Sequence, residues 1–66
     1  MSNFKERLLE EQVQVNELRN KLSDFMKSEK FAEIEPVQMS LLNIQLNAMT
    51  TYSQCLTERM TWLSKE

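Results

Sequence analysis

The 66-residue sequence contains no glycine and no histidine, and it has one proline and one cysteine. The lack of glycine excludes the phosphate-binding P-loop, the dinucleotide-binding fingerprint and the nucleophile elbow of hydrolases, because each needs glycine at fixed positions. The lack of histidine removes the commonest general base, and with the single Cys55 it leaves no set of zinc ligands. We therefore expect neither an enzyme, a catalytic residue, a resident cofactor nor a metal site.

The sequence is also poor in net charge and in long apolar runs. Its formal net charge is −2, which predicts no binding to DNA, RNA or an anionic membrane. No apolar run approaches the roughly 20 residues of a membrane-spanning helix, and residues 1–6 lack the apolar segment of a signal peptide. A lone cysteine is typical of a reducing cytoplasm, where we expect the protein to reside.

The first half of the chain has the pattern of one amphipathic helix. Asn3 is a suitable N-cap, and Glu6 stands three residues later, as in a capping box. Apolar residues then recur mostly at three- and four-residue steps, which is typical of a helix face. This pattern predicts a helix over about residues 4–28, with these apolar positions: Leu8, Leu9, Val13, Val15, Leu18, Leu22, Phe25 and Met26.

The second half predicts another helix, over about residues 36–63. Pro36 suits the first turn of a helix, where its missing N–H has no cost. One line at alternating three- and four-residue steps comprises Leu42, Gln45, Met49, Tyr52, Leu56, Arg59 and Leu63, and a second, at steps of seven, comprises Leu41, Ala48, Cys55 and Trp62. Because the connection at 29–35 is short, we expect an all-α fold in which two antiparallel helices form a single hairpin domain over residues 1–66.

The connection carries Phe31 and Ile34, which are apolar for a loop exposed to solvent. Most such side chains are buried, so one interpretation is that they close the end of the hairpin. The alternative is that Phe31 presents its ring to a ligand. The sequence leaves both open.

Charge is distributed unevenly between the two helices. Residues 1–30 hold twelve charged side chains, whereas residues 36–64 hold only Glu58 and Arg59. A helix that is apolar at many angles is usually surrounded by other helices, and a chain this short needs a partner to bury enough apolar surface. We therefore expect a homo-oligomeric helical bundle whose interface lies on the second helix at Leu42, Gln45, Met49, Leu56, Trp62 and Leu63.

Several polar and aromatic side chains of the second helix have two interpretations each. Its neutral amides and hydroxyls either line the rim of an interface or form a pocket that reads a nucleobase. Arg59 could pair with Glu58 of a neighbour, or it could bind a phosphate with its two-pronged guanidinium. Tyr52 could pack in a core or stack on a base. Cys55 is expected to be a small buried hydrophobe.

One stretch resembles a known group of proteins. It reads Phe25-x-x-Ser28-x-x-Phe31, followed by Leu41-Leu42-x-x-Gln45-Leu46-x-Ala48-Met49-x-x-Tyr52-x-x-Cys55-Leu56-x-x-Arg59-Met60. This pattern is similar to small phage proteins that share the helical hairpin domain of the anti-CBASS and anti-Thoeris signal sponges, and the resemblance extends over roughly residues 4–62. It implies a homo-oligomer in the host cytoplasm, often a hexamer. Such an assembly sequesters cyclic nucleotide immune messengers between subunits without cleaving them.

The ligands implied by the resemblance are cyclic dinucleotides, cyclic trinucleotides and cyclic ADP-ribose isomers. A polyanion of this kind needs cations, for which Arg59 is the best placed, with Arg19, Lys27 and Lys30 as contributors from a neighbouring first helix. Its bases need flat surfaces, and Tyr52, Phe31 and Phe25 lie within the stretch that carries the resemblance. The alternative function is a structural or protein-binding helical oligomer with no small-molecule ligand.

Overall fold

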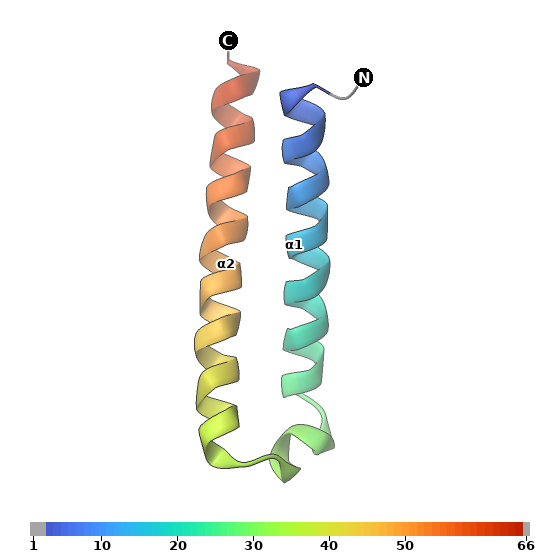
Figure 1. Cartoon of the computed structure of the whole chain (residues 1–66), viewed down its shortest axis with the longest axis vertical. Coiled ribbons are helices and arrows are strands. Elements are labelled where there is room, and N and C mark those ends of the chain that lie inside the picture. Colours follow the sequence, from blue (N-terminus) through green and yellow to red (C-terminus); the bar gives the residue numbers. More distant parts are fainter. Residues whose placement is uncertain (1–2, 66) are drawn as a thin grey trace.

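The computed structural model describes residues 3–65 as two long α-helices joined by a short 3₁₀ helix (Figure 1). Helix α1 comprises Phe4–Met26, η1 comprises Glu29–Glu33, and α2 comprises Pro36–Ser64. The helices lie side by side and run in opposite directions, so the predicted all-α hairpin is confirmed. Met1, Ser2 and Glu66, which belong to the predicted domain, lie outside the described residues.

The hairpin has two different ends, which we call the open end and the closed end. Both termini of the described chain lie at the open end, and η1 lies at the closed end (Figure 1). The molecule is 48 Å long and 20 by 14 Å across. Side chains at opposite ends of one hairpin therefore cannot contact the same small ligand.

Helix α1 begins with the predicted capping box. The Asn3 side chain accepts a hydrogen bond of 2.8 Å from the Glu6 amide, and the Asn3 amide donates to the Glu6 carboxylate at 3.3 Å. The helix ends at Met26, two residues before the expected end, because Ser28 is extended and its hydroxyl donates to the Phe25 carbonyl at 2.6 Å. A serine bonded in this way offers the backbone an alternative to a further helical turn.

The closed end turns the chain without any residue of positive φ among those described. Ser28 and Ile34 are extended on either side of η1, and this arrangement reverses the chain without glycine. Phe31 and Ile34 are half-buried, and the Phe31 ring packs edge-to-face on Phe25, with centroids 6.1 Å apart. This packing supports the interpretation that the apolar residues of the connection close the end of the hairpin.

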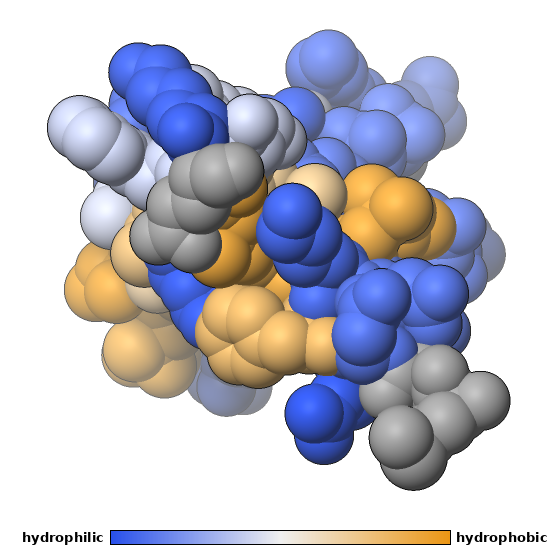
Figure 2. Space-filling model, turned by 90° about the horizontal axis from the view of Figure 1, so that it is seen from above, coloured by the Kyte–Doolittle hydropathy of each residue, from blue (hydrophilic) through white to orange (hydrophobic). Residues whose placement is uncertain are grey.

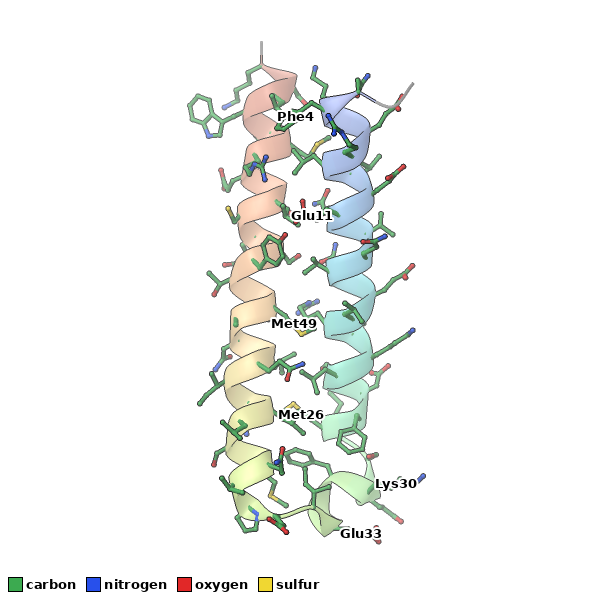
Figure 3. The ribbon with its side chains drawn as sticks, in the orientation of Figure 1. Phe4, Glu11, Met26, Lys30, Glu33 and Met49 are labelled. Carbon is green, nitrogen blue, oxygen red and sulfur yellow. The ribbon has the colours of Figure 1, made fainter. Side chains whose placement is uncertain are left out.

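The two helices meet along a narrow seam, in which Figure 3 shows Met26 and Met49 pointing between the ribbons. Three side chains are buried within residues 3–65, namely Leu8, Val15 and Leu56. All half-buried side chains of α2 except Thr50 continue the same line at steps of three and four, as coiled-coil packing requires. These are Met39, Leu42, Leu46, Met49, Ser53, Met60 and Leu63.

More large apolar side chains are exposed than are buried. In the described part of the chain, the exposed ones are Phe4, Leu9, Val13, Leu18, Val37, Leu41, Ile44, Tyr52 and Trp62. These exposed apolar side chains are available for contact with another molecule.

Neither helix of the described part of the chain is apolar enough over a sufficient length to cross a bilayer.

Candidate ligand-binding surface

The open end brings Arg59 and Phe4 together from the two helices. The guanidinium carbon of Arg59 lies 5.6 Å from the centroid of the Phe4 ring, within the range of a cation–π contact. Both side chains are exposed, and Figure 2, which looks onto this end, shows hydrophobic side chains at the surface between hydrophilic ones. An exposed guanidinium resting on a ring keeps N–H groups free to bind an anion.

Two shallow depressions lie on either side of this pair. One has a volume of about 320 Å³ and is lined by Phe4, Cys55, Glu58, Arg59, Trp62 and Leu63. The other has about 310 Å³ and is lined by Phe4, Arg7, Leu8, Glu11 and Arg59. Each therefore combines one or two arginines with a carboxylate and an aromatic ring. These volumes are at the lower limit for small-molecule pockets, which span about 300–1,000 Å³.

Tyr52 and Trp62 extend the aromatic surface along α2. Tyr52 precedes Arg59 by seven residues, which places it on the same side of the helix about 10 Å away. Both rings are exposed, and the Lys65 ammonium lies 4.6 Å from the centroid of the Trp62 ring. Exposed rings beside cations are able to stack on a nucleobase.

The other predicted ligand residues lie elsewhere on the hairpin. Phe25 and Phe31 pack on each other at the closed end, where Lys27 and Lys30 are exposed, and Figure 3 shows Lys30 pointing away from the helices. Arg19 is half-buried on α1 and donates to the side chain of Asn20 at 3.2 Å. Within one hairpin, the fold thus brings none of these cations to Arg59.

The predicted interface residues fall on two different faces of α2. Leu42, Met49, Leu56 and Leu63 lie on the seam against α1, and Leu56 has 0% of its surface exposed. A side chain without exposed surface in one hairpin cannot also contact a second chain in this conformation. Gln45 and Trp62 are exposed. The surface left for a second chain is therefore that of the exposed apolar residues.

Cys55 is exposed, so the expectation that it is buried was wrong. The residue belongs to the line with Leu41, Ala48 and Trp62, and this line faces away from α1. It also borders the depression at the open end and a third, open one of about 560 Å³ along α2. Its thiol is accessible to reagents.

Several neutral polar groups of α2 are satisfied by their own helix. The hydroxyls of Thr50, Thr61 and Ser64 donate to carbonyls four residues earlier at 2.9–3.0 Å, and the Asn43 amide does the same at 3.0 Å. Groups bonded in this way have less capacity left for a ligand. For these residues, the geometry favours the interpretation as polar surface rather than as a pocket that reads a base.

Two polar side chains of each helix form hydrogen bonds across the seam. We call these four residues the polar layer: Gln12 and Asn16 of α1, and Ser53 and Thr57 of α2. Gln12 donates to the Thr57 hydroxyl at 2.8 Å, and the Ser53 hydroxyl donates to the Asn16 side-chain oxygen. The Thr57 hydroxyl in turn donates to the Ser53 carbonyl at 3.1 Å. These hydrogen bonds connect the two helices of the hairpin, so the groups that form them are not free to bind a ligand.

Sequence analysis did not identify Phe4, Arg7 and Glu11 as site residues. In any antiparallel hairpin the start of α1 lies beside the end of α2. The predicted hairpin therefore already indicated that residues near the start of α1 would lie beside Arg59. In residues 3–65, no cluster of three metal-ligating side chains of the acid, thiol or imidazole type is present.

Comparison with known families supports a binding function. The family model described as Sequestin matches residues 2–61, which is most of the chain. No curated protein and no solved structure matches it. The family name denotes sequestration, that is, binding of a molecule rather than its chemical conversion.

Proposed function

The chain belongs to the Sequestin family, and from this premise we propose that it sequesters cyclic nucleotide immune messengers for a phage. It holds them between subunits in the host cytoplasm and does not cleave them. The messenger is a cyclic dinucleotide, a cyclic trinucleotide or a cyclic ADP-ribose isomer. The homo-oligomer that binds it is a counter-defence protein, because a sequestered messenger no longer activates its receptor.

The observation that carries this proposal is the pairing of Arg59 with Phe4 at the open end. A cyclic nucleotide presents phosphates and flat bases at short separation. The Arg59 guanidinium is suited to the phosphate, and the rings of Phe4, Trp62 and Tyr52 are suited to the bases. A second cation–ring contact, Lys65 over Trp62, lies at the same end of the hairpin.

The electrostatics of the open end indicate that one hairpin is an incomplete site. Glu58 and Glu11 lie in the same depressions as Arg59, and their carboxylates repel a polyanion. Each depression is also small and open. A second subunit that covers this surface would enlarge the pocket and could add the closed-end cations Lys27 and Lys30, which the first hairpin holds too far away.

Titration calorimetry with members of the three messenger classes tests the proposal. We expect saturable binding, and recovery of the intact ligand after heat denaturation of the complex. Arg59→Ala should weaken binding by about 10- to 100-fold, since a charge-assisted hydrogen bond contributes about 1.5–3 kcal/mol. The control is Lys21→Ala, which removes an exposed cation from the C-terminal part of α1, far from the open end, and should leave the affinity unchanged.

Two results would contradict the proposal. Absence of heat with all three classes would favour the alternative function, a structural or protein-binding helical oligomer, which the exposed apolar residues also support. Recovery of linear nucleotides would identify a catalyst instead of a sponge.

A further inference from the structure

We propose that Glu11 and Glu58 are specificity-determining residues at the open end. They select a cyclic messenger, in which each phosphorus carries one negative charge, over open-chain nucleotides that end in a phosphate monoester, such as ATP. This selection rests on the proposed function, because it concerns the same site, and it adds which nucleotides that site rejects. It gives a role to two carboxylates that are unfavourable for the binding of phosphates in general.

The two carboxylates flank Arg59 from different helices. Glu58 precedes Arg59 in α2 and lines the depression of about 320 Å³ that contains Trp62. Glu11 belongs to α1, is half-buried, and lines the depression of about 310 Å³ that contains Arg7. Figure 3 shows Glu11 between the two ribbons, in the half of the hairpin nearest the open end. Because Arg59 lines both depressions, an anion bound to its guanidinium has a carboxylate on either side.

The packing of α1 keeps Glu11 at this position. Phe4, Arg7, Leu8 and Glu11 follow each other at steps of three, one and three residues, so they share one face of the helix. Leu8 is 2% exposed on the seam, and this contact fixes the rotation of α1 about its own axis. The backbone of Glu11 therefore stays beside the depression, and its carboxylate is part of the lining in every copy of the chain.

The charged side chains that line the two depressions cancel each other. They are two arginines and two glutamates: Arg7, Arg59, Glu11 and Glu58. Lys65, over the Trp62 ring, supplies one further cation at this end. Surfaces that bind polyanions by charge alone have a clear excess of cations. The affinity of this site therefore depends on where an anion places its charges, more than on how many it has.

Phosphate esters differ in the property that such a site distinguishes. A phosphate that bridges two sugars, like the pyrophosphate bridge of cyclic ADP-ribose, carries one negative charge per phosphorus. A terminal phosphate carries close to two at neutral pH, because its second pKa is about 6. Like charges within about 4–6 Å of each other disfavour the charged state of both groups. The extra charge of a terminal phosphate at Arg59 meets a carboxylate in either depression.

Cyclic messengers also compensate the carboxylates through hydrogen bonds. An ionised carboxylate only accepts, and the riboses and bases beside a bridging phosphate offer O–H and N–H donors. Hydrogen bonds to a charged acceptor are stronger than those between neutral groups. ATP has such donors on its nucleoside, but its terminal phosphates have mainly acceptors. The same two carboxylates thus attract one class of nucleotide and repel the other, which is a general basis of specificity.

A protein that sequesters a signal needs this selection. ATP and related nucleotides are far more abundant in a cell than a signalling nucleotide, and they carry the same bases. A site made of arginines and aromatic rings alone would bind them and would be saturated before the signal appears. The cost of the two carboxylates in affinity is therefore offset by the exclusion of these competitors.

Titration calorimetry without divalent cations measures the selection as the ratio of the dissociation constants of ATP and of a messenger. The messenger probes are cyclic di-AMP, cyclic tri-AMP and cyclic ADP-ribose, which contain adenine, as ATP does. We expect the unmodified chain to bind ATP at least 100-fold more weakly than the best of these probes. Glu11→Gln and Glu58→Gln, which remove a charge and keep the size, should each lower this ratio by about tenfold, mainly through tighter binding of ATP.

The matched control is Glu17→Gln. It removes the same charge from an exposed position of α1 outside both depressions, so the ratio should not change. If a messenger binds and the ratio is the same in Glu11→Gln, Glu58→Gln and the unmodified chain, the carboxylates do not select, although the proposed function stands. Equal affinity of the unmodified chain for ATP and for the best probe would also overturn the selection. Absence of heat with every probe in every variant would overturn it together with the proposed function.

Discussion

At the scale of single residues, Leu8 and Leu9 show how little of the apolar surface this hairpin buries. The two leucines are adjacent in α1, yet Leu8 is 2% exposed on the seam and Leu9 is 51% exposed. Because successive residues of a helix are 100° apart, only one of them can contact α2. Both residues are leucines with the same helical propensity, so a comparison of their substitutions measures the effect of burial alone.

We expect Leu8→Ala to lower the free energy of unfolding by about 2–5 kcal/mol, since it leaves a cavity beside Val15 and Leu56. Leu9→Ala should change it by less than about 0.5 kcal/mol, as is usual for an exposed position. Urea denaturation followed by circular dichroism measures both. Equal losses for the two variants would show that Leu9 is buried in the assembled protein.

At the scale of the helices, the polar layer fixes how α1 and α2 are aligned. Its four residues interrupt the apolar seam near its centre, and their hydrogen bonds join specific positions of the two helices. A shift of one helix by a turn would break both cross-helix bonds and leave the half-buried Asn16 and Ser53 without these partners. The layer therefore favours one register over its neighbours.

A double-mutant cycle measures this coupling. Asn16→Ala and Ser53→Ala together should cost less than the sum of the single variants, with a coupling energy of about 0.5–1.5 kcal/mol. The control cycle pairs Ser53→Ala with Asn20→Ala, one turn further along α1, and it should show additivity. Additivity in both cycles would mean that the polar layer does not align the helices.

The helices themselves could be predicted from the sequence because their signals are local. The capping box at Asn3 and the position of Pro36 mark helix starts through contacts within one turn. The face of α2 that packs on α1 was harder to predict. Its sequence offers apolar lines at several angles, and the choice between Gln45 and Leu46, or between Tyr52 and Ser53, depends on how α1 lies against it.

The candidate site could be predicted in part, for a similar reason. Arg59, Tyr52 and Trp62 could be identified on α2, because a lone cation and aromatic residues stand out in a helix with few charges. Phe4 is apolar and lies more than fifty residues away in the chain, so only the folded hairpin reveals its contact with Arg59. Residues that a neighbouring copy would contribute to the site cannot be identified from the sequence, because they depend on how two copies pack.

At the scale of the whole molecule, the hairpin has more apolar surface than its own fold covers. The seam buries three residues, of which only Leu56 has no exposed surface, and nine large apolar side chains remain exposed in the described part of the chain. For a rod 48 Å long, a composite pocket of the kind proposed would therefore need a second copy of the chain. A pocket that uses both Arg59 and the closed-end lysines requires at least two hairpins, because one hairpin holds these side chains at opposite ends.

The position of Trp62 gives the protein an intrinsic optical reporter of assembly. It is the single tryptophan of the chain, and it is 64% exposed on the side of α2 that faces away from α1. Indole fluorescence shifts to shorter wavelengths when water leaves the ring. We expect the emission maximum of the unmodified chain to move to longer wavelengths on dilution into the nanomolar range, and Ile44→Asp to produce the same red-shifted spectrum at any concentration. A spectrum that stays constant while sedimentation reports dissociation would place Trp62 outside the contact.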